Sequence, residues 1–208
     1  MINNLAPVFD TEIIRQAHRD YEATGRLLNI IFAKPQEEKA IGEGKVAYVD
    51  MNQSGIAEMT PGQEGILATD ALGGCTGVSG FARMPDGALN LMVSHYNETS
   101  QNFNNTGCSS PANLDMYGFM RTNVPVLFVV AYHDSVFSPL QRDERKRNNP
   151  FEKWHYLDQI RTTATQLGEN SKVIEIPYEP NKTGHSLAAG RINGVEGIFW
   201  DGHRVDFS

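Results

Sequence analysis

The feature that most constrains the fold is a hairpin-like stretch near the middle of the chain. Residues 76–83 and 88–96 have the composition of β-strands, and a Pro-Asp-Gly sequence at 85–87 separates them. Proline presets φ at the first turn position and glycine accepts a positive φ at the last, which suits a three-residue hairpin loop. The sequence therefore predicts two antiparallel strands in which Met84 pairs with Ala88.

The register of this hairpin brings a thiol and an imidazole together. Counting outward from the first pair places Cys75 opposite Asn97, and His95 becomes the diagonal neighbour of Cys75. Side chains along a strand alternate between its faces, so Cys75 and His95 share one face. Diagonal neighbours are about 7–8 Å apart at their Cα atoms, within reach of an imidazole. A shift of one residue would move His95 to the opposite face.

A cysteine beside a histidine is the arrangement of a thiol nucleophile. The histidine takes the thiol proton and stabilises the thiolate, which is the reactive form. Gly73 and Gly74 allow a sharp backbone path into Cys75 and can expose amide groups to an oxyanion. Thr69 is a candidate for the group that holds the imidazole of His95 in its productive tautomer. The alternative is structural, with a small buried thiol and an ordinary hydrogen-bonded histidine at a strand end.

The composition narrows the class of protein further. A chain of 208 residues, 40% of them hydrophobic, is expected to form a single domain over residues 1–208. The net charge of -7 argues against broad nucleic-acid binding and favours a protein or small-molecule partner. No apolar stretch has the length of a membrane helix, and the N-terminus lacks the pattern of a cleaved secretory signal. The two cysteines, Cys75 and Cys108, form no disulfide scaffold, so we expect free thiols in a reducing compartment, and a single bridge between the two is the alternative.

The remaining patterns predict a mixed α/β fold in which strands outnumber helices. The run at 124–132 is continuously apolar, which is typical of a central strand. Helices are expected after an Asp10-Thr11 cap, ending at Gly25, and over 151–167. Further strands are expected at 26–33, 45–51 and 172–178, with a terminal hairpin at 197–208 that turns at Asp201-Gly202. Loops or turn-rich segments are expected at 34–44, 52–65, 97–113 and 138–150.

Other candidate residues carry weaker signals. Cys108 is a rival nucleophile, but it lies in a polar loop with no histidine nearby in the sequence. His133, in the sequence Ala-Tyr-His-Asp at 131–134, follows the strongest strand, where an ordinary strand-end histidine is the simpler interpretation. His155 and His185 are expected to be structural or exposed, and His203 to face solvent. The six histidines are scattered, so we expect no metal site and no cofactor.

The residues around the hairpin resemble a known family. Thr69, five intervening residues and Cys75, the sequence Leu-Gly-Gly-Cys at 72–75, and the downstream His95 together resemble the Cys-His glutamine deamidases. These include the chemoreceptor deamidases, the catalytic domain of cytotoxic necrotizing factors and the Burkholderia lethal factor. This chain has Gly73 where the toxins have serine, Gly74 where the chemoreceptor deamidases have serine, and a slightly longer cysteine-to-histidine gap. The resemblance covers about thirty residues.

The resemblance implies a fold, an activity and a setting. The fold would be a single-domain sandwich of mixed β-sheets with helices outside, as in the necrotizing-factor catalytic domain. Cys75, His95 and Thr69 would deamidate the side chain of a glutamine in a target protein, with the Gly74 amide as an oxyanion donor. We expect a monomeric bacterial toxin or effector acting in the host cytosol, on a translation initiation helicase or a Rho-type GTPase, or else an enzyme of the bacterial cytoplasm. The alternatives are a non-catalytic binding module on the same fold and a cysteine peptidase-like amide hydrolase.

Overall fold

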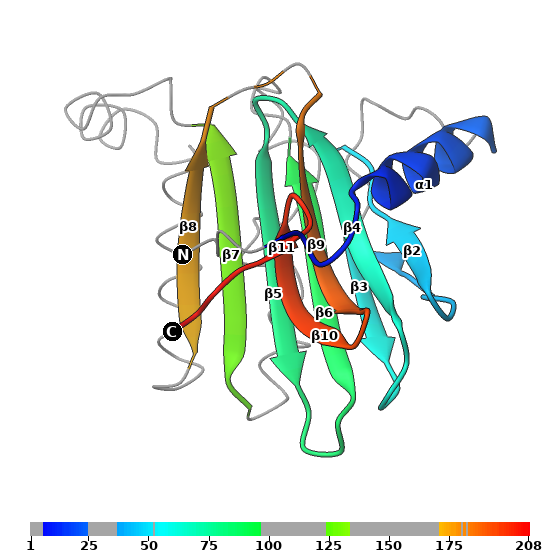
Figure 1. Cartoon of the computed structure of the whole chain (residues 1–208), viewed down its shortest axis with the longest axis vertical. Coiled ribbons are helices and arrows are strands. Elements are labelled where there is room, and N and C mark those ends of the chain that lie inside the picture. Colours follow the sequence, from blue (N-terminus) through cyan, green and yellow to red (C-terminus); the bar gives the residue numbers. More distant parts are fainter. Residues whose placement is uncertain are drawn as a thin grey trace.

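The structure is a computed structural model that describes residues 6–24, 37–51, 53–96, 124–133, 171–179, 181 and 183–208. The described residues form one helix and two β-sheets, which confirms the mixed α/β class expected from the sequence (Figure 1). Within these residues, no helix has both the length and the apolar character needed to cross a bilayer.

The larger sheet has six strands and contains the predicted hairpin. Its order is β1 (Glu37–Glu38), β3 (Gln53–Met59), β6 (Leu89–Tyr96), β5 (Thr76–Arg83), β7 (Val126–His133) and β8 (Lys172–Tyr178). The β1–β3 and β7–β8 pairs are parallel, and the other pairs are antiparallel. The apolar strand β7 lies between β5 and β8, so the prediction that it has neighbours on both sides is confirmed.

The smaller sheet has five strands and is built mainly from the C-terminal part of the chain. Its order is β11 (His203–Arg204), β10 (Val195–Trp200), β9 (His185–Ile192), β4 (Gly65–Leu72) and β2 (Lys45–Tyr48). Tight turns at Asn193-Gly194 and Asp201-Gly202 connect β9, β10 and β11, and all four turn residues have positive φ. Such turns match the twist of antiparallel strands. The expected terminal hairpin is therefore confirmed.

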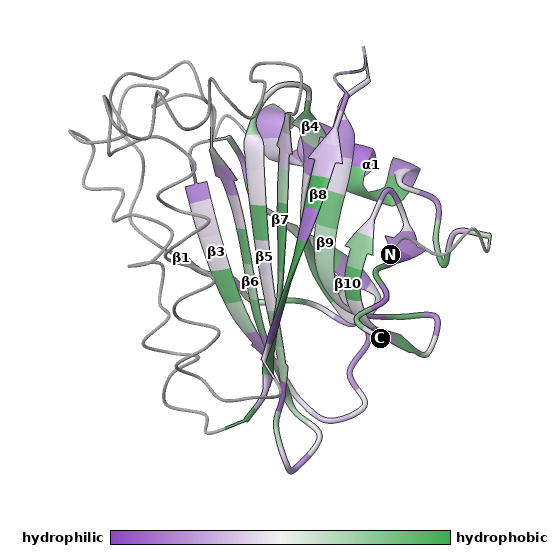
Figure 2. Cartoon of the chain, turned by 90° about the vertical axis from the view of Figure 1, so that its left-hand side faces the viewer, coloured by the Kyte–Doolittle hydropathy of each residue, from purple (hydrophilic) through white to green (hydrophobic). Residues whose placement is uncertain are grey.

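The two sheets pack face to face and share a hydrophobic core. Leu67 and Leu187 of the five-stranded sheet belong to the same buried cluster as Leu91, Val93 and Val129 of the six-stranded sheet. Figure 2 shows the two layers nearly edge-on, with hydrophobic residues along strands of both sheets. The arrangement is a sheet-on-sheet sandwich of the kind that buries one face of each layer.

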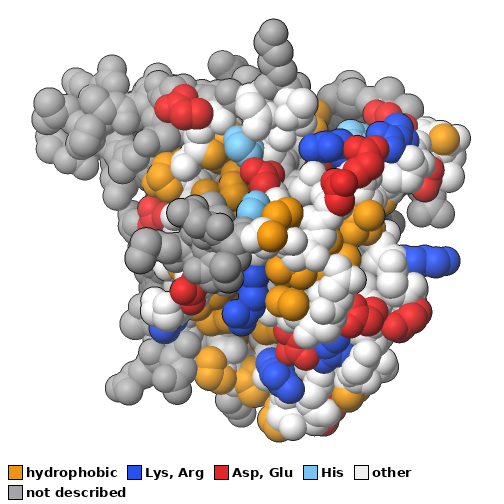
Figure 3. Space-filling model, in the orientation of Figure 1, with side chains coloured by type: hydrophobic (Ala, Val, Ile, Leu, Met, Phe, Trp, Pro, Cys, Tyr) orange, Lys and Arg blue, Asp and Glu red, His pale blue; other side chains and the backbone are white. Residues whose placement is uncertain are grey.

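Helix α1 (Glu12–Ala23) covers the other face of the five-stranded sheet. Its fully buried Ile14 packs with Ile66 and Ala68 of β4, whose neighbouring residues face the core between the sheets. The Asp10 carboxylate accepts a hydrogen bond from the Glu12 amide at 2.9 Å, which supports the expected cap. The opposite face of the helix is charged, and Figure 3 shows acidic and basic side chains intermingled in that region.

Several expected elements differ from the structure. The segment 52–65, expected to be turn-rich, contains the seven-residue strand β3, and the expected loop 34–44 contains the short strand β1, so both expectations are wrong there. Residues 53–59 form a strand because their backbone pairs with β6 over the whole length of β3, and most of these residues are buried. The expected strand 26–33, the loops 97–113 and 138–150, the helix 151–167 and Gly25 lie outside the described residues.

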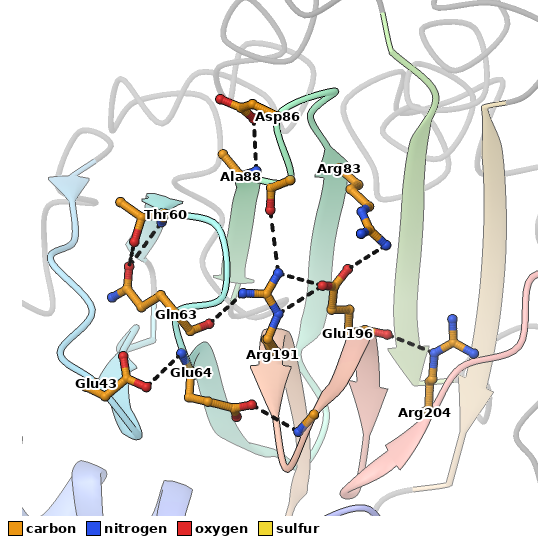
Figure 4. A network of polar contacts seen from close by, with 12 residues as sticks. Glu43, Thr60, Gln63, Glu64, Arg83, Asp86, Ala88, Arg191, Glu196 and Arg204 are labelled. Atoms are coloured by element: carbon orange, nitrogen blue, oxygen red, sulfur yellow. Dashed lines mark hydrogen bonds and ion pairs between the residues drawn. The ribbon is translucent and has the colours of Figure 1, made fainter.

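A buried arginine, Arg191, contacts several chain segments at the end of the sandwich that carries the β5–β6 turn. Arg191, at the end of β9, donates to the Glu196 carboxylate at 2.9 and 2.5 Å and to the main-chain oxygens of Gln63 and Gly87 at 3.0 and 3.5 Å. Gln63 and Gly87 belong to two separate turns, and Glu196 belongs to β10 (Figure 4). The guanidinium therefore connects the β5–β6 hairpin of one sheet to turns of the other.

Candidate active site

The hairpin has the register that its turn predicts. The Met84 amide donates to the Ala88 carbonyl at 2.8 Å, and outward pairing places Gly77 opposite His95. An added Cβ at Gly77 would meet the side chains of Leu72 and Leu187 from the other sheet. Gly77 therefore faces the core between the sheets, and its partner His95 faces the same way. The prediction of the register is confirmed.

The segment that carries Cys75 is the crossing from one sheet to the other. Strand β4 ends at Leu72 in the five-stranded sheet, and β5 starts at Thr76 in the six-stranded sheet. The crossing is short, because only residues 73–75 lie between the two strands. An added Cβ at Gly74 would meet no atom of the described residues within 4 Å, so the described part of the chain leaves this side of the peptide open. This openness fits an amide that is accessible to a substrate oxygen.

An irregularity in β4 changes which residues face the core just before the crossing. The pairing between β4 and β9 shifts between Thr69 and Leu72, and Ala71 adopts a left-handed conformation with φ of 57°. Thr69 and Leu72 both face the core, although they are three residues apart, and Asp70 faces the helix side. Bulges of this kind commonly redirect side chains next to functional sites.

Thr69 and His95 meet across the interface between the sheets. The Thr69 Oγ1 atom lies 2.8 Å from Nδ1 of His95, and both side chains are buried. The contact between these two residues that the family resemblance implies is therefore present. The threonine hydroxyl can donate to a bare Nδ1 or accept from a protonated one. With the proton on Nδ1, Nε2 is left as the acceptor, which is the tautomer that a base at Nε2 requires.

Burial keeps His95 neutral. Desolvation, followed by the nearby charge of His18, lowers the pKa of His95 from 6.5 to about 3. The imidazolium form is disfavoured because a charge is costly to bury without a paired counter-charge. At neutral pH, His95 is therefore a proton acceptor and not a standing positive charge.

Cys75 lies at the edge of the same core. Its side chain is partly exposed and packs against the buried cluster between the sheets, which is the side that His95 also faces. The Tyr178 hydroxyl, at the end of β8, donates to the Cys75 carbonyl oxygen and anchors the crossing. The Nε2 atom of His95 is buried and has no hydrogen-bond partner within the described part of the chain. Catalytic hydrogen bonds often form only when a substrate binds. Cys75 and His95 both face the core between the sheets, so a contact between their side chains can form there.

A second histidine, His185, which the sequence predicts to be structural or exposed, flanks the crossing. His185 Nδ1 lies 2.6 Å from Asp201 Oδ2, and the other oxygen of Asp201 accepts from the Ser186 amide at 2.9 Å. The His185 ring stacks on Trp200 and meets Tyr178 edge-on. His185 Nε2 lies 3.1 Å from both the Asn181 amide nitrogen and the Glu179 carbonyl oxygen, so the ring is held on all sides. No local spacing predicted this pair, which depends on the β9–β10 register.

A third polar group lies on the helix side of β4. The Asp70 carboxylate accepts from the Tyr48 hydroxyl at 2.9 Å, and His18 Nδ1 lies 2.9 Å from the same oxygen. His18 also stacks on the Tyr48 ring. Burial and the Asp70 carboxylate raise the pKa of Tyr48 well above its usual range, so the phenol stays protonated. This group fixes β4 from behind the Thr69 site.

The other sequence candidates have separate outcomes. Cys108, His155 and Asp134 lie outside the described residues, whereas His133 ends β7, where its backbone pairs with Tyr178. His203 lies in β11, next to the final turn. Across the described ranges, no three histidine, cysteine or acidic side chains are grouped to hold a metal ion.

Comparison with known proteins gives no family for the chain. No protein-family model matches it, and no curated protein has a matching sequence.

Proposed function

We propose that this protein is a protein-glutamine deamidase with Cys75 as its nucleophile, His95 as its acid–base group and Thr69 as the residue that orients His95. The observation that supports this most directly is the hydrogen bond between Thr69 and His95, which joins two sheets. The partly exposed Cys75 packs on the same core. A nucleophile, a base and a residue that orients the base are the parts that nucleophilic amide hydrolysis requires.

The proposed reaction has two stages. Nε2 of His95 takes the Cys75 proton as the sulfur attacks the carboxamide carbon, and the resulting imidazolium gives that proton to the departing ammonia. The Gly74 amide, in the open crossing, is the proposed donor to the oxyanion. Water then hydrolyses the thioester and releases glutamate. The target protein gains one negative charge.

The low pKa of His95 fits a base that is charged only during the reaction. A resting thiolate–imidazolium pair is disfavoured, because burial lowers the pKa of His95 to about 3. Proton transfer from the thiol to Nε2 of His95 therefore accompanies sulfur attack.

The choice of a protein glutamine as the substrate rests on the resemblance of residues 69–95 to the deamidases. The same resemblance supports an effector that acts in a host cytosol, on a translation initiation helicase or a Rho-type GTPase. The acidic net charge of -7 fits a protein target better than a nucleic acid.

Ammonia release from a host-cell lysate tests this proposal. The wild-type protein is expected to release ammonia, and intact-mass analysis should find one lysate protein converted from carboxamide to carboxylate without chain cleavage. Cys75→Ser should abolish both signals and retain the fold. Chain cleavage would indicate a peptidase. If neither protein releases ammonia, the non-catalytic binding module is the better interpretation. Equal release from the wild type and Cys75→Ser would show that Cys75 is not the nucleophile.

A further inference from the structure

Two buried polar atoms on neighbouring strands face the core with no partner among the described residues. They are Oε1 of Gln53 on β3 and Nε2 of His95 on β6. Gln53 and His95 are directly opposite each other in the β3–β6 pairing, so their side chains share one face. Directly opposed residues have Cβ atoms about 4.5–5.5 Å apart. Both side chains are at least nine-tenths buried.

The other polar atom of each side chain is already bound. Thr69 holds Nδ1 of His95 at 2.8 Å, and the Gln53 amide nitrogen donates to the Tyr21 hydroxyl at 3.1 Å. These contacts leave two acceptors without a donor: the amide oxygen of Gln53 and the Nε2 atom of His95. Two acceptors cannot bond to each other, but one water can donate to both. An unsatisfied buried polar atom costs about 1–3 kcal/mol, and proteins commonly satisfy such atoms with an ordered water.

We infer that Gln53 and His95 hold between them the water that hydrolyses the thioester on Cys75. This inference rests on the proposed function. The water donates one hydrogen to Gln53 Oε1 and the other to the neutral Nε2 of His95, so an oxygen lone pair remains for the acyl carbon. Gln53 is thus a water-positioning residue, which the sequence interpretation missed because its segment was expected to be turn-rich.

The step balances as follows. The water oxygen forms a bond to the thioester carbonyl carbon, and one water proton moves to Nε2 of His95. The carbon–sulfur bond then breaks, the sulfur leaves with the bonding electrons, and Nε2 returns the proton to it. The products are a carboxylic acid and the Cys75 thiol, with Gln53 unchanged.

Burst kinetics with p-nitrophenyl acetate separate acylation from deacylation. Acylation of Cys75 releases a burst of p-nitrophenolate, and the later steady rate reports hydrolysis of the acetyl thioester. Gln53→Met is expected to leave the burst within about twofold of wild type and to lower the steady rate about tenfold or more. The acetylated protein should accumulate in intact-mass spectra. Gln53→Glu, which keeps an acceptor oxygen, should recover much of the steady rate.

The controls distinguish this inference from the proposed function. Gln63→Met changes a residue that contacts Arg191, at the end of the sandwich that carries the β5–β6 turn. This variant should leave the ratio of burst to steady rate unchanged. If Gln53→Met lowers both phases equally, the water site is wrong and the nucleophile proposal stands. If the wild type shows no burst, or Cys75→Ser keeps it, the nucleophile proposal fails. A crystal structure provides a second measurement: density for a water between Gln53 and His95 is expected, and a dry gap would overturn the inference.

Discussion

The Thr69 hydroxyl lies 2.8 Å from Nδ1 of His95, although β4 and β6 belong to different sheets. Backbone pairing alone cannot create this contact, because the two strands are not hydrogen-bonded neighbours. It depends on the packing of one sheet on the other and on the irregularity of β4 after Thr69. The candidate site is therefore a property of the sandwich and not of the hairpin alone.

The first prediction concerns the threonine hydroxyl. Thr69→Val keeps the shape of the side chain and leaves Nδ1 of His95 buried without its partner. We expect a loss of about 1–3 kcal/mol in the free energy of unfolding, measured by urea denaturation. Ammonia release should fall about 10- to 100-fold, because the imidazole loses its fixed orientation. Thr69→Ser, which keeps the hydroxyl, should retain most of the activity, and equal losses in both variants would contradict an orienting role.

The second prediction concerns the pH dependence of stability. The folded-state pKa of His95 is about 3, and the pKa of an exposed histidine is 6.5. Between these pH values, the unfolded chain binds a proton that the folded protein does not bind. Stability from this residue is present above about pH 6.5 and is lost as the pH falls toward about 3, with a slope approaching 1.4 kcal/mol per pH unit. Urea titrations over this range should give a shallower slope for His95→Gln than for the wild type. Parallel curves would show that His95 is not buried and neutral.

The third prediction concerns the anchor of the Cys75 backbone. Tyr178→Phe keeps the ring that packs against Trp200 and His185, and it removes the hydroxyl that donates to the Cys75 carbonyl. We expect a small loss of stability, about 0.5–1.5 kcal/mol. The burst rate with p-nitrophenyl acetate should fall more than this loss explains, because the crossing that carries the thiol is less fixed. An unchanged burst rate would remove Tyr178 from the site.

The fourth prediction separates stability from activity at the far ends of the strands. Arg191→Met removes a buried guanidinium and leaves Glu196 without its main partner, so we expect a loss of about 2–4 kcal/mol in chemical denaturation. Arg83 also pairs with Glu196, at 3.4 Å, but its side chain is 65% exposed, so Arg83→Met should cost less than about 1 kcal/mol. Activity per folded molecule should be unchanged in both variants. A selective loss of activity in Arg191→Met would show that the two strand ends are coupled.

The sequence predicted the hairpin because turn chemistry determines its register. A Pro-Asp-Gly loop allows one pairing of the flanking strands, and Gly77 is opposite His95 as that pairing requires. The Asn193-Gly194 turn carried an equally direct signal for the β9–β10 hairpin, which the sequence interpretation did not use. The contact between Thr69 and His95 came from the family resemblance, since sequence spacing says nothing about how two sheets pack.

Strand β3 was missed for a physical reason. Its first residues, Gln53, Ser54 and Gly55, lack the apolar alternation of an ordinary strand but are buried. Gly55 is crowded, because an added Cβ would lie 2.8 Å from the Val49 side chain. Gln53 faces the interior beside His95, where we infer that it positions a water. A propensity scale does not represent such a role, so it does not predict a strand that begins with this residue.

The central claim is that the sulfur of Cys75 and the imidazole of His95 work as a pair, and the rate of Cys75 alkylation tests it most directly. Iodoacetamide is attacked by the sulfur as the thiol loses its proton, so a base at Nε2 of His95 speeds the reaction, and the modified residue is identified by peptide mass mapping. At neutral pH we predict faster alkylation of Cys75 in the wild type than in His95→Gln. The difference should disappear above about pH 9–10, where thiols ionise unaided. Identical rates in the two proteins at every pH would contradict the account.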